Sequence, residues 1–158
     1  MSDVVRIKKV VEEAYDTKTF FFDWNAEARP GQFIMVWIPG VDEIPMSISS
    51  ITDSTKSITV KAIGVATRAI HELKEGDRIS IRGPFGNGFD LDSGKMLIIG
   101  GGVGTAAIMP AVAATGADTI IAARSDRDVI LEEKARKFGV QAAFIHQDMC
   151  ELELPRRV

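Results

Sequence analysis

Cysteine is almost absent from this chain: Cys150 is the one thiol among 158 residues. A single thiol cannot close an internal disulfide, and an iron–sulfur cluster needs about four cysteines. The composition therefore excludes a disulfide framework and a complete cluster built from this chain alone. The polar sequence around Cys150 favours an ordinary cysteine over a redox-active thiol.

Long apolar runs and basic clusters are also missing. The longest apolar runs, 96–99 and 106–114, fall well short of the roughly 20 residues that a membrane span needs, so we expect no membrane contact. The N-terminus has no basic region followed by an apolar stretch, which predicts a cytoplasmic protein without a secretory signal. The formal charge is −3 and no basic stripe is present, so nucleic acid is not an expected partner.

The first 90 residues have the pattern of successive β-strands. Six segments rich in valine, isoleucine, threonine and phenylalanine are separated by turn residues, and they span 4–11, 17–22, 32–38, 46–51, 57–63 and 78–82. Six such strands predict a small closed barrel. One short amphipathic helix is expected over 67–74, with Thr67 as its N-cap.

The pattern changes after residue 90. Residues 96–99 are continuously apolar, as in a strand covered on both faces of a parallel sheet. A glycine loop, an alanine-rich helix, a second strand, a second helix and a third strand follow; the last three are expected over 119–123, from Ser125 or Asp126 to Phe138, and over 140–145. This β-α-β-α-β order predicts a partial Rossmann-like sheet. We expect a β-barrel domain over 1–92 and an α/β domain over 93–158.

The clearest candidate site is the loop from Gly100 to Thr105, between a buried strand and a helix. Its glycines let the backbone approach a diphosphate, and the helix N-terminus offers free amides. The loop lacks the third glycine of the usual dinucleotide fingerprint, and no acidic residue follows the second strand to bind a ribose. Arg124 and Ser125 stand there instead, where they can contact a ribose or a phosphate. The alternative is a tight turn that binds no ligand.

Three other segments carry weaker signals. Residues 45–50 offer hydroxyl groups to flavin ring atoms or to phosphate, although a serine-rich edge strand is the more common explanation of such a segment. Residues 64–67 stand at a strand-to-helix junction, which suits a phosphate or an ordinary helix cap. Residues 83–89 bring two aromatic rings near the domain boundary, for a cofactor or for core packing.

Six ordered segments together resemble the ferredoxin reductase superfamily. They are Pro30-Gly31-Gln32-Phe33, Pro45-Met46-Ser47, Gly64 with Thr67, Gly76-Asp77, Gly83-Pro84 with Gly86 and Phe89, and Gly101-Gly102 with Gly104-Thr105. The resemblance covers roughly residues 3–145 and is closest to the electron-transfer subunits of dihydroorotate dehydrogenase, which serve pyrimidine biosynthesis. It implies a six-stranded antiparallel Greek-key barrel that binds FAD, followed by part of an NAD(P)-binding domain.

The resemblance also implies which residues bind the cofactors. The flavin ring and ribityl chain would lie against Ile44, Pro45, Met46 and Ser47; the adenosine side would approach Thr59, Val60 and Lys61; and the diphosphate would lie near Gly64, Ala66 and Thr67. NAD(P)H would bind on Gly101, Gly102, Val103, Gly104 and Thr105, with Arg124 beyond them. Because the flavin carries the redox chemistry, no side chain is assigned as catalytic and none as a metal ligand.

The family passes electrons onward through a [2Fe–2S] cluster to a catalytic subunit that interconverts dihydroorotate and orotate. The resemblance therefore implies such a dehydrogenase, or another redox protein, as the partner, and it leaves a homodimer open. No ligands for the cluster are present in this chain.

Three departures from the family pattern keep alternatives open. Glu43 and Ile44 stand where relatives commonly have an arginine, so the phosphate charge must be met elsewhere, with Lys61 and Arg68 as candidates. Ala66 replaces a usual glycine, and the four-cysteine segment is missing. The chain is then an NADH-oxidising subunit, a flavin-binding or docking module without NADH turnover, or the related subunit of a hydrogenase or an NADH-dependent ferredoxin reductase. NAD and NADP both remain possible nucleotides.

Overall fold

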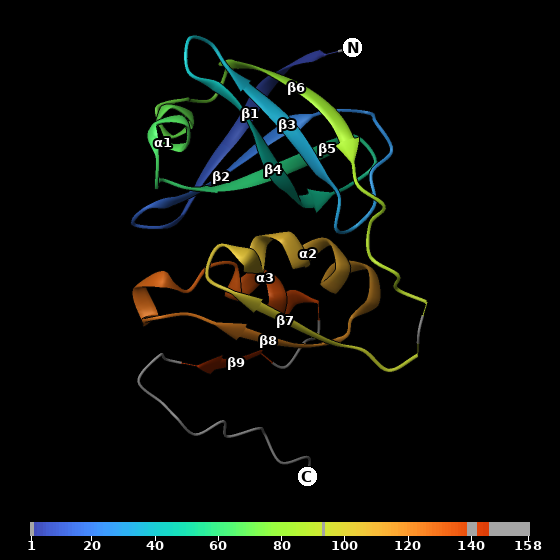
Figure 1. The fold of residues 1–158 in the computed structure, drawn as a ribbon. Coiled ribbons are helices and arrows are strands. Elements are labelled where there is room, and N and C mark those ends of the chain that lie inside the picture. The colour runs from blue at the N-terminus through green and yellow to red at the C-terminus, as the bar shows by residue number, and fades with distance from the viewer. Residues whose placement is uncertain (1, 93, 139–141, 146–158) are drawn as a thin grey trace.

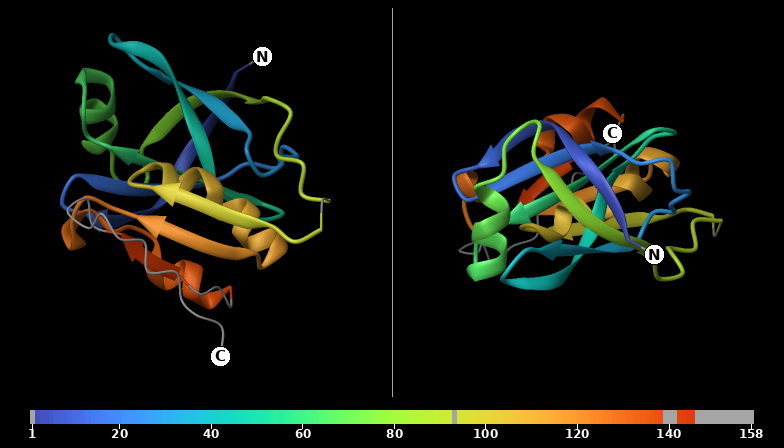
Figure 2. Two further views of the ribbon diagram at one scale, coloured as in Figure 1. Left: turned by 60° about the horizontal axis from the view of Figure 1, so that its bottom comes forward. Right: turned by 90° about the horizontal axis from the view of Figure 1, so that it is seen from above.

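The computed structural model describes residues 2–92, 94–138 and 142–145. A β-barrel formed by the first part of the chain lies above a small parallel sheet formed by the second part (Figure 1). Helix α2 packs against β4 of the barrel and β7 of the sheet, so it lies between these two parts. The left view of Figure 2 shows the same stacking, and the right view looks from above onto the barrel.

The barrel is closed by six strands. They are β1 (Asp3–Ala14), β2 (Thr17–Asp23), β3 (Phe33–Ile38), β4 (Asp42–Ile51), β5 (Thr55–Lys61) and β6 (Arg78–Phe85). Their order is β1-β2-β5-β4-β3-β6, and every neighbouring pair is antiparallel. Because β5 lies between β2 and β4, the path is a Greek key and not a simple meander. The predicted six-stranded antiparallel barrel is confirmed.

Alternate side chains of the strands fill the barrel interior. Phe20 and Phe22 on β2 and Ile34 and Val36 on β3 are all fully buried, as expected for strands with one face toward a core. The short helix α1 (Val65–His71) adds Ile70 to the same apolar cluster. Burial of these large side chains stabilises the barrel by roughly 1.5–3 kcal/mol each.

The second part of the chain is a three-stranded parallel sheet in the order β7-β8-β9. Its elements are β7 (Leu97–Gly101), α2 (Gly104–Thr115), β8 (Asp118–Ala122), a 3₁₀ turn η1 (Asp126–Asp128), α3 (Glu132–Lys137) and β9 (Ala142–Ile145). Ile98 packs with Val112 of α2, and Ile121 packs with Met109 of α2 and Ala135 of α3. The predicted β-α-β-α-β order is confirmed.

Several predicted element boundaries differ from those of the structure. Strand β4 begins at Asp42 instead of residue 46, because residues 42–47 pair with β3 along their whole length. Helix α1 begins at Val65 with Gly64 as its N-cap, so Thr67 is the third helical residue. The helix expected to run to Phe138 is split into η1 and α3, because Leu131 adopts a left-handed backbone with φ of 59°. Residues 139–141, where that helix was expected to stop and the next strand to start, lie outside the described residues.

Candidate functional site

The two central strands of the barrel separate at one end. Strand β4 pairs with β5 only from Ile48 to Ile51, opposite residues 56–58. Before Ile48, β4 follows β3, whereas β5 continues past Ile58 to Lys61 along β2. Residues 42–47 and 59–61 therefore lie where β4 and β5 are not paired with each other, and we call this divergence of the two strands the opening.

The residues that the family resemblance assigns to FAD lie on the two sides of this opening. On β4, Pro45 and Ser47 are exposed, whereas Ile44 and Met46 are half-buried against the barrel core. On the other side are Thr59, Val60 and Lys61, and the chain then leads directly into the turn before α1. Segments far apart in sequence are thus placed around one opening of the barrel.

The Thr59 hydroxyl is already used inside the protein. It is hydrogen-bonded to Thr19 Oγ1 at 2.8 Å and to Ser49 Oγ at 2.9 Å, and Ser49 is in turn 2.9 Å from Ser57 Oγ. All four side chains are buried. This row of hydroxyls holds three neighbouring strands together, so the Thr59 side chain has a structural role.

The turn from Gly64 to Thr67 is held by its own threonine. Thr67 Oγ1 accepts hydrogen bonds from the N–H groups of Ile63 and Gly64, each at 2.9 Å, and donates to Gly64 O at 3.1 Å. Thr67 is therefore not the predicted N-cap; it is the third helical residue, and its hydroxyl accepts from the backbone of the N-cap Gly64. Ala66 is half-buried and packs against the barrel core.

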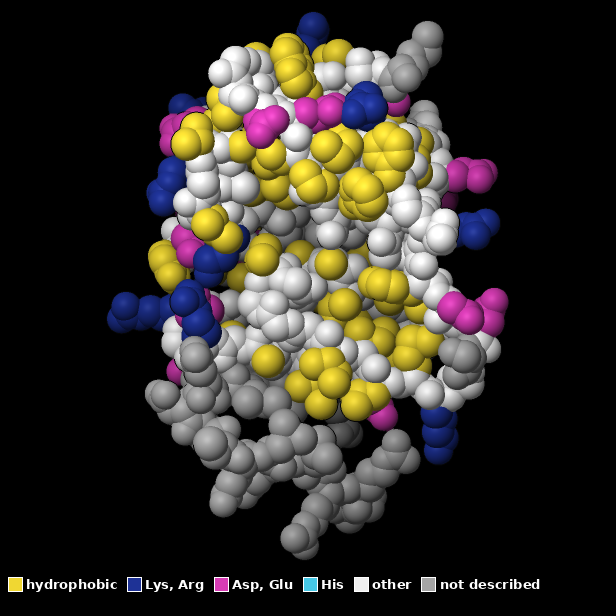
Figure 3. All heavy atoms as spheres, in the orientation of Figure 1, with side chains coloured by type: hydrophobic (Ala, Val, Ile, Leu, Met, Phe, Trp, Pro, Cys, Tyr) yellow, Lys and Arg dark blue, Asp and Glu magenta, His cyan; other side chains and the backbone are white. Residues whose placement is uncertain are grey.

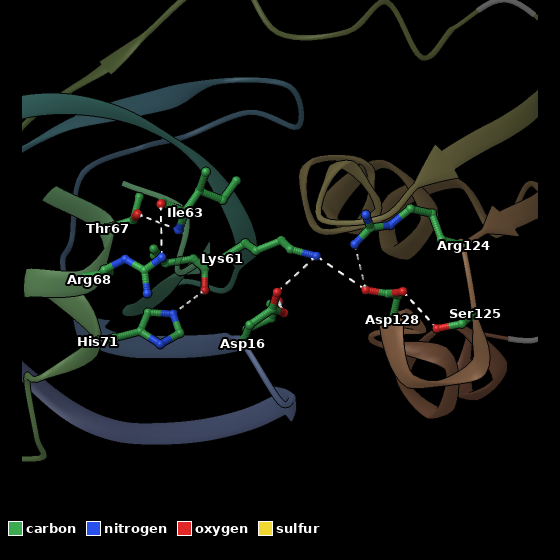
Figure 4. A network of polar contacts seen from close by, with 11 residues as sticks. Asp16, Lys61, Ile63, Thr67, Arg68, His71, Arg124, Ser125 and Asp128 are labelled. Carbon is green, nitrogen blue, oxygen red and sulfur yellow. Dashed lines mark hydrogen bonds and ion pairs between the residues drawn. The ribbon is translucent and has the colours of Figure 1, made fainter. Parts of the chain in front are cut away.

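Lys61 and Arg124 both contact Asp128, a residue that the sequence did not predict to be part of the site (Figure 4). Lys61 Nζ lies 3.2 Å from Asp16 Oδ2 and 3.4 Å from Asp128 Oδ1. Arg124 Nη2 lies 3.3 Å from the same Asp128 oxygen, and Ser125 Oγ donates to the other at 2.8 Å. The i,i+4 spacing of Arg124 and Asp128 was a usable signal, whereas the pairing with Lys61 depends on the tertiary fold.

This network shifts the acid–base properties of its members. The hydrogen bond from Ser125 holds the pKa of Asp128 below its usual range, and Arg124 and Lys61 reinforce it against the opposing effect of burial. Burial by itself would lower the pKa of Lys61, but the hydrogen bonds and charges of Asp16 and Asp128 raise it. Burial opposes the ionised form of Asp16 as well, yet Thr17 and Lys61 lower its pKa. All three groups are therefore charged at neutral pH.

Neighbouring backbone contacts complete this region. His71 Nε2 lies 2.7 Å from Val60 O and joins α1 to β5. Arg68 Nη2 donates to Ile63 O at 3.4 Å and leaves the rest of its guanidinium exposed.

The glycine loop connects β7 to α2, and there is free space around its backbone. Cβ atoms added at Gly101, Gly102 or Gly104 would meet nothing within 4 Å, and Gly102 has a positive φ of 51°. No side chain caps the N-terminus of α2. Thr105, in its first turn, is completely buried, and its hydroxyl has no hydrogen-bond partner among the described residues. An unpaired buried hydroxyl is unusual in a native protein and marks this turn as a candidate for ligand contact.

Gly100 allows close packing of β7 against α2, a role that the sequence did not predict. A Cβ at this position would lie 2.8 Å from Thr105 Cα and 2.7 Å from Ile108 Cδ1. The glycine thus lets β7 and α2 approach closely, which in the usual dinucleotide fingerprint is the role of the third glycine.

An arginine on β6 neutralises Glu43, the acidic residue that departs from the family pattern. Arg82 donates to Glu43 through Nε at 2.7 Å and through Nη2 at 2.6 Å. This two-point contact lowers the pKa of Glu43 and raises that of Arg82. Strands β6, β3 and β4 are neighbours, so the pair spans the outer face of the barrel beside the opening.

Two further properties limit the chemistry of the described residues. None of their helices is long and apolar enough to cross a membrane. No group of three or more histidine, cysteine, aspartate or glutamate side chains is arranged to hold a metal among residues 2–92, 94–138 and 142–145. Cys150 lies outside these ranges.

Known proteins resemble the chain in sequence and in structure, although no family model matches it. A probable dihydroorotate dehydrogenase B (NAD(+)) electron transfer subunit from Thermoplasma acidophilum is 43% identical over 130 residues, or 82% of this chain and 51% of the relative. The corresponding Methanothermobacter thermautotrophicus protein is 39% identical over 156 residues, or 92% of this chain and 58% of the relative. The chain thus spans about half the length of the curated relatives it matches.

A solved structure shares the fold. The NADH-dependent reduced ferredoxin-NADP oxidoreductase is 27% identical and superposes with a TM-score of 0.81, covering 93% of this chain and 58% of that one. The order of the barrel strands and the following parallel sheet agree with this likeness. The chain is thus similar in sequence to electron transfer subunits of dihydroorotate dehydrogenase B and in sequence and fold to a ferredoxin-NADP oxidoreductase.

Proposed function

We propose that this chain is the flavin-binding part of an electron transfer subunit that passes electrons between NAD(P)H, FAD and a partner dehydrogenase. The observation that carries the proposal is the opening between β4 and β5, with the predicted FAD residues on both of its sides. We assign FAD to residues 1–92 and a partial NAD(P)-binding domain to residues 93–158.

The residues around the opening fit FAD in three respects. Pro45 offers an exposed apolar ring to a flavin, and Ser47 offers an exposed hydroxyl on the same face of β4. Arg68 supplies an exposed guanidinium in the first turns of α1. Gly64 leaves that turn open, since a Cβ there would meet nothing within 4 Å.

The chain's own residues position the redox centre. FAD, when bound, accepts a pair of electrons as hydride and can release them singly. The β4 segment provides a fixed apolar wall for the ring, because it is paired with β3 throughout. Arg82 is occupied by Glu43, and Lys61 is already matched by Asp16 and Asp128, so the exposed guanidinium of Arg68 is the better source of phosphate recognition.

The N-terminus of α2 fits the diphosphate of a pyridine nucleotide. Gly101, Gly102 and Gly104 expose backbone, and Val103 leaves the helix amides uncapped by any side chain. The buried Thr105 hydroxyl without a partner is a second sign of a ligand at this turn. Arg124 follows β8 at the position where a ribose or its phosphate is bound in doubly wound folds. We leave NADH and NADPH as alternatives.

The partner is proposed from the names of the relatives. They are called electron transfer subunits of dihydroorotate dehydrogenase B, so we propose a dihydroorotate dehydrogenase-like catalytic subunit as the electron acceptor or donor. A [2Fe–2S] cluster in that route must take its ligands from outside the described residues.

A flavin-binding module without NADH turnover is the second candidate. The observation that favours it is the ion pair of Arg124, the predicted ribose contact, with Asp128, which already engages that guanidinium. Such a module would hold FAD in the barrel and leave nucleotide oxidation to other elements.

An anaerobic visible spectrum of the purified chain tests both candidates. The sample is first saturated with FAD and separated from free flavin, and NADH and then NADPH are added. Retained flavin that is bleached by a pyridine nucleotide supports the proposed function, and retained flavin that stays oxidised supports the second candidate. A chain that retains no flavin contradicts both. Ser47→Arg places a bulky charge on the exposed face of β4 beside the opening and should abolish retention, whereas Val4→Arg, on an exposed position of β1, serves as the control.

A further inference from the structure

Charged side chains from both parts of the chain meet where the barrel joins the parallel sheet. Lys61 ends β5 of the barrel, whereas Arg124 and Asp128 follow β8 of the sheet. In the close view, Lys61 reaches across to Asp128, and Arg124 approaches the same carboxylate from its own side (Figure 4). Lysine and arginine side chains with acidic ones beside them also gather along the left edge of the molecule near this level (Figure 3). One carboxylate therefore contacts cations from both parts.

The Asp128 carboxylate has one oxygen for two cations. Ser125 Oγ donates to Oδ2 at 2.8 Å, whereas Lys61 Nζ and Arg124 Nη2 lie 3.4 Å and 3.3 Å from Oδ1. A charge-assisted hydrogen bond between nitrogen and oxygen closes to about 2.7–2.9 Å, so both contacts are longer than this optimum. The Asp128 side chain is only 10% exposed, so water screens it weakly. Lys61 and Arg124 therefore compete for the same oxygen.

Most of the Arg124 guanidinium is available to a ligand. Its side chain is 65% exposed, and Asp128 is its one hydrogen-bond partner among the residues that the structure describes. A guanidinium carries five N–H donors. In doubly wound folds an arginine near the end of the second strand accommodates the 2′-phosphate of NADP. The strength with which Asp128 holds Arg124 therefore affects the binding of such a phosphate.

The barrel fixes the position of Lys61 beside Asp128. The ammonium of Lys61 also lies 3.2 Å from Asp16 Oδ2, and Asp16 in turn accepts from Thr17 Oγ1 at 2.9 Å. Lys61 is the last residue of β5, and its side chain is 21% exposed. The barrel thus holds a cation that draws the Asp128 carboxylate away from Arg124.

We propose that Lys61 is a positioning residue for the nucleotide site: by competing for Asp128, it frees Arg124 to bind the 2′-phosphate of a pyridine nucleotide. The inference rests on the proposed nucleotide site at α2 and β8. Asp128 opposes an anion at Arg124 in two ways, because it occupies the guanidinium and carries a like charge. Lys61 reduces both effects. The barrel is thereby coupled energetically to a ligand that binds the other part of the chain.

Isothermal titration calorimetry of the full chain with NADP⁺ tests the proposal as a double-mutant cycle. Lys61→Met should weaken binding roughly three- to tenfold, since Asp128 then pairs with Arg124 alone. Asp128→Asn should tighten binding by a similar factor. The double variant should bind as Asp128→Asn does, because Lys61 acts only through the carboxylate. NAD⁺ lacks the 2′-phosphate and should respond less than about twofold to each change.

A second ion pair of the barrel provides matched controls. Lys8 Nζ lies 2.9 Å from Asp23 Oδ2. Asp23 ends β2, whereas Lys61 is paired with Thr17 at the start of that strand. Lys8→Met and Asp23→Asn make the same changes in charge, and they should leave the NADP⁺ affinity within about twofold of wild type. Lys61→Gln should repeat the effect of Lys61→Met, and urea unfolding of every variant reports folding separately.

The sign of each effect decides the outcome. Opposite effects of Lys61→Met and Asp128→Asn, with the double variant tighter than wild type, support the proposal. A purely structural role of the ion pair predicts that both variants weaken binding. A direct contact of Lys61 with the phosphate predicts that Lys61→Met still weakens binding in the Asp128→Asn background. Either result overturns the proposal and leaves the nucleotide site in place, whereas failure of every variant to bind either nucleotide overturns the proposed site as well.

Discussion

The ammonium of Lys61 at the end of β5 lies 3.4 Å from Asp128 Oδ1 in η1, and this ion pair joins the barrel to the parallel-sheet part of the chain. Asp16, in the turn between β1 and β2, holds the same ammonium at 3.2 Å. The side chains of all three are at least three-quarters buried. One residue that the family resemblance assigns to FAD therefore also fixes how the two parts meet.

Acid should weaken this contact. The pKa values of Asp128 and Asp16 are lower in the folded chain than in the unfolded chain, so below about pH 5 the unfolded state binds more protons. The free energy of unfolding should therefore fall as the pH falls through about 4. The raised pKa of Lys61 stabilises the fold at every pH below about 10 and does not contribute to this acid loss.

Asp128→Asn should reduce that acid sensitivity. Urea unfolding at pH 7 and pH 4 should show a smaller difference in the free energy of unfolding for the variant than for the wild type. Glu27→Gln, at an exposed carboxylate, should keep the wild-type difference. Equal differences in all three proteins would show that Asp128 does not carry the effect.

Gly100→Ala should destabilise the sheet. The added Cβ would lie 2.8 Å from the backbone of Thr105, which cannot move without shifting α2, and overpacking of this kind costs about 1–3 kcal/mol. Gly101→Ala is the matched neighbour, with open space around its Cβ, and should change the free energy of unfolding by less than about 0.5 kcal/mol. Urea unfolding at neutral pH measures the free energy of unfolding of both variants. Equal losses for Gly100→Ala and Gly101→Ala would contradict a packing role of Gly100.

The barrel could be predicted from sequence because its signals are local. Alternating apolar residues and the turns at Pro30-Gly31 and Gly76-Asp77 mark each strand by itself. The resemblance of the ordered motifs to a known family then predicted the Greek-key order of these strands. The first half of β4 was missed, because Asp42, Glu43 and Pro45 are poor strand formers by composition. Their pairing with β3 overrides that preference.

The candidate site was harder to predict than the fold. The position of Lys61 beside Asp128 joins residues 67 apart, and no local pattern encodes such a contact. The break at Leu131 has the same origin: its left-handed backbone follows from burial of Leu131 and Ile130 under α2, and not from a glycine or proline. Side-chain partners set by tertiary packing could not be read from the sequence.

Thr59→Val should affect stability more than flavin binding. The substitution keeps the shape but removes a buried hydroxyl that contacts Thr19 and Ser49, at a cost of about 1–3 kcal/mol. Thr55→Val, at a more exposed hydroxyl of the same strand, should cost less. Urea unfolding and flavin titration on both variants separate the two roles. A large loss of FAD affinity with unchanged stability would contradict the structural role.

Thr67→Val should impair both the turn before α1 and the binding of FAD. The hydroxyl accepts from the N–H groups of Ile63 and Gly64, so its loss leaves two donors to water and costs about 1 kcal/mol of stability. The turn is exposed and short, so its disorder should reach the opening where we propose the FAD diphosphate, and FAD affinity should fall about tenfold. Thr67→Ser keeps the hydroxyl and should restore both properties in thermal unfolding and in a flavin fluorescence titration. If valine keeps both properties, or if serine loses them as much as valine does, the hydroxyl alone does not hold the turn and the capping argument is wrong.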